Sequence, residues 1–263
     1  MTTTLLLIWC ACLGDGLALW SVSVARRDAS IVDIFWGPAF VIAILLAWLR
    51  GGHPSVWHHL LLAMVALWGL RLAVHIAWRG HGHGEDRRYA AMREHHGPRF
   101  RWVSLFTVFL LQGTLAALLS APLVIVQLQP IVHPAWCLTG AALWLLGFLC
   151  EAVADAQLLT FQRDPASRGK VLSSGLWRLS RHPNYFGESL LWWGYGAFAL
   201  SVAGGFWTLY APLAMTVLLL RVSGVPMLEA GIEKRRPGYR EYIERTSSFV
   251  PWWPRRQART VGH

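Results

Sequence analysis

Charged side chains are scarce in this sequence, and acidic ones most of all. Asp, Glu, Lys and Arg together make up 14% of the 263 residues, whereas 55% are hydrophobic. A typical soluble domain carries about 25% charged residues. The composition therefore excludes an ordinary soluble domain and predicts an integral membrane protein.

Other features are also missing. No Gly/Ser/Pro-rich linker or internal repeat divides the chain, so we expect one membrane-embedded domain over residues 1–263. The four cysteines lie in apolar runs without a CxxC motif or a neighbouring His pair, so neither a disulfide framework nor a metal site is expected. No GxGxxG follows a strand pattern, which excludes a soluble Rossmann domain.

What the chain has instead is a series of apolar runs of transmembrane length. About 20 apolar residues suffice to cross a bilayer as a helix. The first run lacks a basic leader and a small-residue cleavage site, so it is predicted to be a retained helix. The last two are short and joined by Gly204-Gly205, which predicts a tight helical hairpin. The predicted fold is an all-α, polytopic membrane bundle of about seven helices, over residues 5–24, 31–49, 56–78, 102–127, 136–161, 186–203 and 206–222.

Basic residues follow alternate spans. Two arginines follow the first span, six the third, five basic residues the fifth and eight the seventh, while the other loops hold only Arg50. Because short loops rich in Lys and Arg stay in the cytoplasm, the N-terminus is predicted outside and the C-terminus inside. This asymmetry also accounts for the net charge of +10, so no nucleic-acid partner is expected.

Carboxylates at membrane depth are costly and normally face a polar interior. Asp33, Asp155, Glu188 and Glu229 all lie near the predicted cytoplasmic ends of spans. We therefore predict a polar cavity that opens to the cytoplasm. The arginines that border it suit an anionic ligand.

The segment 151–188 carries the most specific pattern. Pro183 prevents a helix from running through Arg181 and His182, so a turn is predicted to present His182 and Asn184 before span six begins. A helix N-terminus at such a turn can bind an anion. Lys170, Arg178 and Arg181 can bind phosphate oxygens, whereas Asp155 or Glu188 can accept hydrogen bonds from ribose hydroxyls.

At this point the sequence resembles a known family. Its motifs are "GLWRLSRHPNYFGE", "WWGYG" and "VSGVPMLEAGIEKRRPGYREYIERTSSFVPWWP", with "IVDIFWGPAF", "LWGLRLAVHIAWR", "EDRRYAAMR" and "LQG" earlier in the chain. They resemble the superfamily of steroid 5-alpha-reductases and sterol C14 reductases, in particular its bacterial branch, the DUF1295 family. The resemblance implies a reductase of the bacterial inner membrane with NADPH as its cofactor.

The resemblance also implies where each ligand binds. Residues 131–263 would form the cofactor side and residues 1–130 the substrate side. The implied cofactor-binding residues are Asp155, Arg163, Arg181, Asn184, Glu188, Tyr239, Tyr242 and Arg245.

The predicted chemistry is hydride transfer to an activated C=C bond of a steroid-like or other lipid that enters from the bilayer. The Gln-Glu pair and the Tyr that steroid reductases use to bind the ketone are not cleanly present. In place of these residues, the sequence offers three candidate catalytic residues, Asp33, Glu85 and Tyr89. Tyr89 or a protonated Asp33 is the predicted acid that stabilises charge on the carbonyl oxygen.

Two other functions fit part of the pattern. Isoprenylcysteine and phospholipid methyltransferases share an RHPxY-like turn, here with His182 and Tyr185, and a C-terminal Glu, here Glu229, near a Tyr pair. In those enzymes these residues bind S-adenosylmethionine. A lipid-binding or transport role is the third possibility, because intramembrane carboxylates also mark transport paths. The basic loop favours the dinucleotide, since S-adenosylmethionine has no phosphate.

The arginine asymmetry gives a first testable prediction. Reporter fusions after Gly52, Gln129 and Gly204 should report the outside, and fusions after Asp28, Gly97, Gly169 and Thr260 the cytoplasm. A cytoplasmic signal at Gln129 would contradict the count of seven spans.

Overall fold

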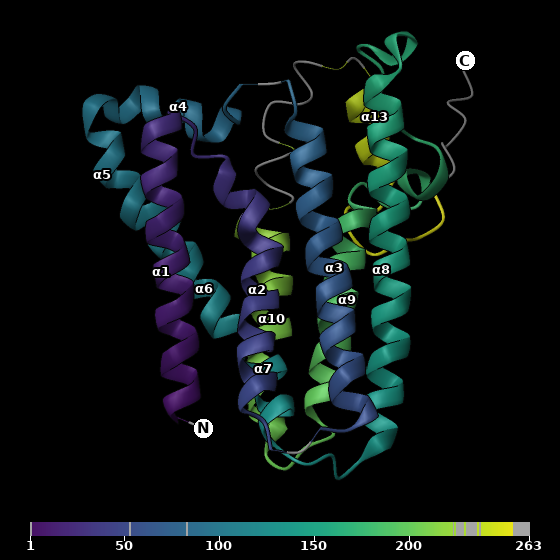
Figure 1. The fold of residues 1–263 in the computed structure, drawn as a ribbon. Coiled ribbons are helices and arrows are strands. Elements are labelled where there is room, and N and C mark those ends of the chain that lie inside the picture. Colours follow the sequence, from purple (N-terminus) through teal and green to yellow (C-terminus); the bar gives the residue numbers. More distant parts are fainter. Residues whose placement is uncertain are drawn as a thin grey trace. The chain divides into compact units, whose positions relative to one another are not determined.

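A computed structural model describes residues 2–52, 54–82, 84–222, 224, 229, 236 and 238–254, and these are mostly helical with no β-strand (Figure 1). Part of the predicted basic tail, residues 255–263, lies outside the described residues. The prediction of an all-α fold is confirmed. The helices are α1 (Thr2–Arg26), α2 (Ile31–Arg50), α3 (Val56–Gly80), α4 (Arg87–His96), α5 (Phe100–Ser104), α6 (Leu111–Leu119), α7 (Ala121–Leu128), α8 (Pro134–Arg163), α9 (Pro183–Ala199), α10 (Tyr210–Val217) and α13 (Tyr239–Arg245).

Six segments of the described chain are long and apolar enough to cross a membrane. They are Thr2–Arg26, Ile31–Arg50, Val56–Gly80, Arg87–Leu119, Pro134–Arg163 and Gly205–Val222. The remaining candidate, α9, has 17 residues. At about 1.5 Å per residue it is slightly shorter than a hydrocarbon core of about 30 Å. The chain is thus a multi-pass membrane protein, and a bundle of about seven helices fits it.

The chain divides into two compact units. Unit 1 comprises residues 1–138 and 195–211, and unit 2 comprises residues 139–194 and 212–263. All three predicted catalytic residues belong to unit 1, and all the predicted cofactor-binding residues belong to unit 2. The prediction of one domain over the whole chain stays a prediction.

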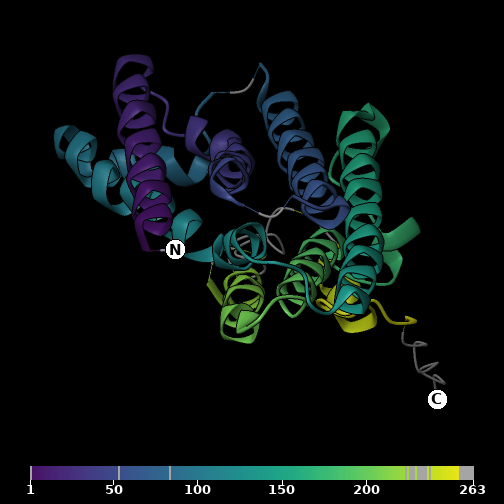
Figure 2. The same ribbon diagram turned by 60° about the horizontal axis from the view of Figure 1, so that its bottom comes forward.

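In unit 1, glycines allow helices to approach closely. A Cβ added at Gly37 would lie 2.3 Å from the Gly69 carbonyl oxygen, which brings α2 and α3 side by side (Figure 1, Figure 2). A Cβ at Gly113 of α6 would lie 2.6 Å from the Cys12 carbonyl oxygen of α1. Small residues at helix contacts are typical of membrane bundles, where lipid removes the hydrophobic drive for helices to associate.

The fourth predicted span, 102–127, differs in its boundaries. A helical segment runs from Arg87 to Leu119, with a short 3-10 turn at 97–99 and a π-helical stretch at 105–110. The α-helix is then interrupted at Ser120, and α7 follows as a separate short helix. Pro122 accounts for the break, because proline lacks an N–H and restricts the residue before it.

In unit 2, α8 and α9 pack through glycines on both helices. A Cβ at Gly187 would lie 2.5 Å from the Glu151 amide nitrogen, and one at Gly147 would lie 2.5 Å from the Gly187 carbonyl oxygen. This close packing buries the intramembrane carboxylates Glu151 and Asp155 to 2% and 5% exposure. Both carboxylates therefore lie in the interior of the protein and away from lipid.

Two predicted turns are present. Gly204 has a φ of 68°, a left-handed conformation that glycine adopts without strain, so the predicted turn at Gly204-Gly205 is confirmed. The predicted turn before span six also forms, but α9 begins at Pro183 and not at Phe186. Asn184 therefore lies inside the first turn of α9, and only His182 precedes it. Proline fits the first helical position, since its missing N–H has no helical partner there.

Gly37→Ala should destabilise the protein, because the new methyl group would meet the backbone of α3 and no flexible side chain could move aside. Overpacking of this kind costs about 1–3 kcal/mol. Thermal unfolding in detergent measures it. Gly14→Ala is the matched control, because nothing lies within 4 Å of a Cβ at that position of α1. Equal midpoints for the two variants would contradict the close contact.

Candidate functional site

The predicted catalytic residues Asp33 and Tyr89 meet in unit 1. Tyr89 Oη donates a hydrogen bond to Asp33 Oδ1 at 2.7 Å, and Arg88 Nη2 donates to Asp33 Oδ2 at 2.6 Å. Asp33 lies in the first turn of α2, whereas Arg88 and Tyr89 lie in the first turn of α4. The Tyr89 side chain is buried.

Asp86 fixes the start of α4 and thereby places Arg88 and Tyr89. Its carboxylate accepts hydrogen bonds from the Arg88 backbone N–H and from Arg88 Nε, both at 2.9 Å. Burial alone would raise the Asp86 pKa, but the hydrogen bonds and charge of Arg88 outweigh it and hold that pKa below its usual value. Asp86 is thus an ionised helix cap.

The two donors on Asp33 bear on the identity of the acid. Each carboxylate oxygen of Asp33 accepts one hydrogen bond, and one of the two donors is a guanidinium. Asp33 is thus the acceptor in both contacts, whereas the Tyr89 hydroxyl is a donor. Tyr89 is therefore the better candidate for a proton donor.

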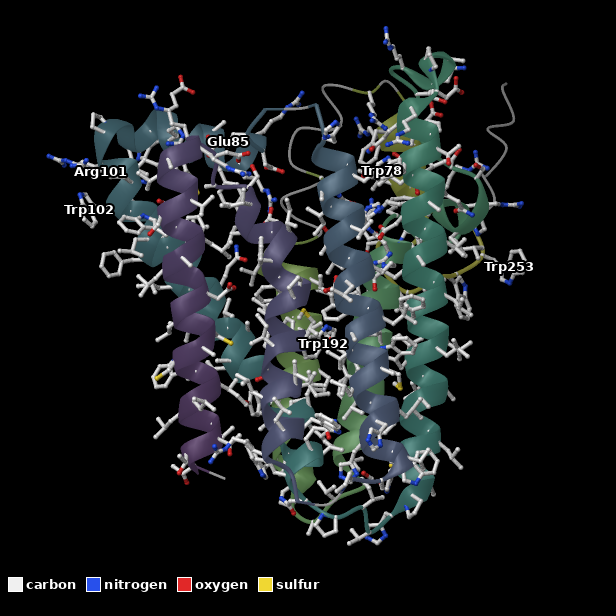
Figure 3. The ribbon with its side chains drawn as sticks, in the orientation of Figure 1. Trp78, Glu85, Arg101, Trp102, Trp192 and Trp253 are labelled. Carbon is white, nitrogen blue, oxygen red and sulfur yellow. The ribbon has the colours of Figure 1, made fainter. Side chains whose placement is uncertain are left out.

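Glu85 is engaged in a different contact. Its two oxygens accept hydrogen bonds from Arg93 at 2.7 and 2.8 Å, and Oε1 also accepts from the Ala29 backbone N–H at 2.8 Å. Glu85 lies at the same end of unit 1 as Arg101 and Trp102 (Figure 3). These contacts hold the turn between α1 and α2 onto α4, so Glu85 fits a positioning role better than a catalytic one.

Gln112 of α6 is a polar neighbour that the sequence reasoning did not select. Its Nε2 lies 3.4 Å from Tyr89 Oη. With Asp15, Trp36 and other residues it lines a cavity of about 20 Å³. That volume holds about one water molecule. The signal in the sequence was an amide within an apolar run, which at membrane depth indicates function.

In unit 2, the predicted cofactor-binding residues cluster where α8 meets the start of α9. Asn184 Nδ2 donates to Asp155 Oδ1 at 3.1 Å. His182 Nε2 lies 2.9 Å from Glu229 Oε1, and Arg181 Nε lies 3.2 Å from the same oxygen. The Tyr185 ring stacks on His182 with centroids 5.8 Å apart.

Four buried polar atoms in this cluster have no hydrogen-bond partner among the described residues. Arg181 Nε is one, although it lies in ion-pair distance of Glu229, and the others are Arg181 Nη1, His182 Nδ1 and Asn184 Oδ1. Since Nε2 of neutral His182 donates to Glu229, its Nδ1 is an acceptor. The cluster thus offers one cationic donor and two acceptors, which suits a ligand that carries both phosphate oxygens and polar N–H or O–H groups.

The C-terminal part of unit 2 holds the loop before α9 in place. Tyr242 Oη donates a short hydrogen bond to the Trp177 carbonyl oxygen, and the Arg181 N–H donates to the Ser247 carbonyl oxygen at 2.8 Å. Burial raises the pKa of Tyr242 above its usual value, so the hydroxyl stays protonated and can donate. The same segment ends in exposed Trp253, which points away from the helices (Figure 3).

The other predicted cofactor-binding residues differ in their burial. Tyr239 is buried beside Tyr242, with ring centroids 5.7 Å apart. Glu188 is half-buried one turn after Asn184 in α9. Four basic residues are exposed: Arg163, Lys170, Arg178 and Arg245. Of the basic residues predicted to bind phosphate, Arg181 alone is not exposed, since its side chain has a relative exposure of 10%.

A family model described as "Protein of unknown function (DUF1295)" matches residues 19–246. The chain belongs to this family. An "Uncharacterized protein C594.04c" of Schizosaccharomyces pombe is 26% identical over 90% of this DUF1295 chain and 76% of its own length. No solved structure matches the present chain.

The DUF1295 chain is also similar to proteins named "3-oxo-5-alpha-steroid 4-dehydrogenase 1". The protein from Bos taurus is 34% identical over 32% of each chain, and that from Mus musculus is 30% identical over 44% of this chain and 45% of its own. The chain thus spans less than half the length of these relatives. The resemblance to the steroid 5-alpha-reductase superfamily is confirmed.

His182 gives a testable pH dependence. Its burial, together with Arg181, lowers its pKa below 6.5 despite the opposing effect of Glu229. The unfolded state therefore binds more protons just below pH 6.5, and folding stability should fall as the pH drops through that value. Thermal unfolding is measured in detergent at pH 7.5 and 5.5. The midpoint should fall further between these pH values for the wild type than for His182→Gln, and an equal fall for both proteins would contradict the lowered pKa.

Proposed function

We propose that this DUF1295 protein is an NADPH-dependent membrane reductase that acts on an activated C=C bond of a steroid-like or other lipid. The partial similarity to steroid dehydrogenases supports the reaction class. The observation that carries the cofactor assignment is the buried Arg181 guanidinium, whose Nη1 has no hydrogen-bond partner within the described part of the chain. The proposal includes entry of the lipid from the bilayer and a location in the bacterial inner membrane.

The residues of unit 2 fit the polar half of a dinucleotide. Arg181 would bind a phosphate oxygen through Nη1, and Asn184 Oδ1 and His182 Nδ1 would accept from ribose hydroxyls or the carboxamide. Glu229 would keep Arg181 and His182 oriented, as its contacts with both already do. When bound, NADPH would supply the hydride.

The residues of unit 1 would bind and polarise the lipid. Tyr89 would donate a hydrogen bond to the carbonyl oxygen conjugated with the C=C bond, where negative charge develops. Its proton is directed at Asp33, so donation to substrate requires the hydroxyl to rotate away. The charge of Asp33 stays compensated by Arg88 when it does. Gln112 would hold the phenol oxygen from the side of α6.

S-adenosylmethionine is the competing cofactor, and phosphate distinguishes the two. S-adenosylmethionine has no phosphate, but its carboxylate can also pair with a guanidinium, so Arg181 alone does not choose between the two cofactors. The binding experiment therefore includes both cofactors.

Isothermal titration of the detergent-purified protein with NADPH, NADH and S-adenosylmethionine tests the proposal. We expect NADPH to bind, and Arg181→Met to weaken it by about tenfold to a hundredfold, because a charged hydrogen bond contributes about 1.5–3 kcal/mol. Higher salt should weaken binding less than this substitution does, since the guanidinium is largely buried.

Arg178→Ala is the matched control, because Arg178 is exposed in the same loop. It should bind NADPH like the wild type, and the unfolding midpoint of ligand-free Arg181→Met reports whether that variant folds. Binding of S-adenosylmethionine without NADPH would overturn the reductase proposal. Equal NADPH affinity in folded Arg181→Met and wild type would remove Arg181 from the site.

A further inference from the structure

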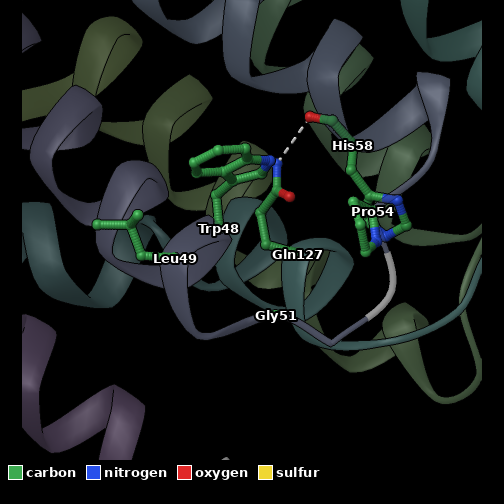
Figure 4. Close-up of a pocket in the computed structure, with 6 residues that line it drawn as sticks. All are labelled: Trp48, Leu49, Gly51, Pro54, His58 and Gln127. Carbon is green, nitrogen blue, oxygen red and sulfur yellow. Dashed lines mark hydrogen bonds between the residues drawn. The ribbon is translucent and has the colours of Figure 1, made fainter.

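Unit 1 contains a second pocket, which neither the cofactor nor the lipid proposal uses. Its volume is about 270 Å³, and it is lined by Trp48, Leu49, Gly51, Pro54, His58 and Gln127 (Figure 4). These residues come from the end of α2, the start of α3 and α7. The backbones are close here, since a Cβ at Gly51 would lie 2.2 Å from the Gln127 carbonyl oxygen.

This pocket is remote from the Asp33 cluster in the same unit. Asp33 lies in the first turn of α2 and Trp48 in its last turn. A helix rises about 1.5 Å per residue, so roughly 20 Å separates the two along α2. A ligand here would therefore not compete directly for Tyr89.

The imidazole of His58 has both nitrogens occupied. Nδ1 accepts from the Ser55 backbone N–H at 3.1 Å, so Nε2 carries the proton of the neutral ring and donates to the Gln129 carbonyl oxygen at 3.1 Å. His58 is therefore a neutral wall of the pocket, and none of the six lining residues carries a charge.

In contrast to the His58 nitrogens, two buried atoms of the lining have no hydrogen-bond partner in the described chain. They are Trp48 Nε1, a donor, and Gln127 Oε1, an acceptor. The Gln127 amide cannot be reversed, because its Nε2 donates to the His58 carbonyl oxygen at 3.0 Å (Figure 4). Gln127 is 2% exposed, so its free oxygen has no access to bulk water.

We propose that this pocket binds a small neutral amphiphile through a hydroxyl group. A hydroxyl can accept from Trp48 Nε1 and donate to Gln127 Oε1. A ketone can only accept and an ammonium group can only donate, so neither of them can make both hydrogen bonds. The apolar body of the ligand would lie against the Trp48 ring, Leu49 and Pro54. Absence of charge in the lining disfavours phosphate and carboxylate head groups. The inference goes beyond the proposed reductase function and does not depend on it.

The probe pair 2-naphthol and naphthalene tests the hydroxyl directly, because the two differ by that group alone. Each is titrated into the detergent-purified protein, and the thermal unfolding midpoint is followed. We expect 2-naphthol to raise the midpoint saturably and naphthalene to have little effect. Trp48→Phe keeps the aromatic wall but removes the N–H, so it should require about tenfold more 2-naphthol for the same shift.

Trp102→Phe is the matched control, since Trp102 is 52% exposed and does not line the pocket; it should respond like the wild type. No shift with either probe would mean that the pocket holds water only, which overturns the proposal. An unchanged response of Trp48→Phe, or equal effects of the two probes, would overturn it as well.

Displacement of bound 2-naphthol by two lipids shows which class of lipid supplies the hydroxyl group. If a 3-hydroxysteroid displaces 2-naphthol from the wild type, a sterol-type hydroxyl is the ligand, and if 1-octanoylglycerol displaces it, the ligand is a glyceride. Displacement by neither would contradict a lipid amphiphile. NADPH binding is measured in parallel, so failure here is distinguishable from failure of the reductase proposal.

Discussion

Close backbone contact between helices at glycine is the constraint on which each unit depends. Lipid is as apolar as a leucine side chain, so the helices gain little from burying apolar surface against one another, and van der Waals packing must hold them. Gly37 and Gly69 provide that contact in unit 1, and Gly147 and Gly187 in unit 2. Polar groups such as Asp155 can then be buried between helices and away from lipid.

The membrane character and helix positions could be predicted because each depends on local composition. An apolar run of about 20 residues has few alternatives to a spanning helix. The break at Ser120 was harder, since Pro122 lies within an otherwise unbroken apolar run, and proline in a membrane helix can also be accommodated as a kink. The apolar run predicts the start of α9 at Phe186, three residues late, because Pro183, Asn184 and Tyr185 also fit a loop.

The sequence singles out residues for the candidate site, but it does not predict how they contact one another. The sequence indicates that Asp33 and Tyr89 are unusual, yet their contact joins residues 56 positions apart. Glu85 looked equivalent to them, and its pairing with Arg93 became visible only in three dimensions. Among the basic residues of the loop, sequence alone could not separate Arg181, which burial makes distinctive, from Arg178, which is exposed.

The backbone pairing of residues 247–252 with residues 179–181 has a consequence for biosynthesis. The Arg181 N–H bonds to Ser247, and the Trp252 N–H bonds to the Leu179 carbonyl oxygen at 2.9 Å. A ribosome makes residues 247–252 after residues 179–181 and after the spanning segment Gly205–Val222. The loop that holds Arg181 therefore cannot form these two hydrogen bonds until that later segment has been made.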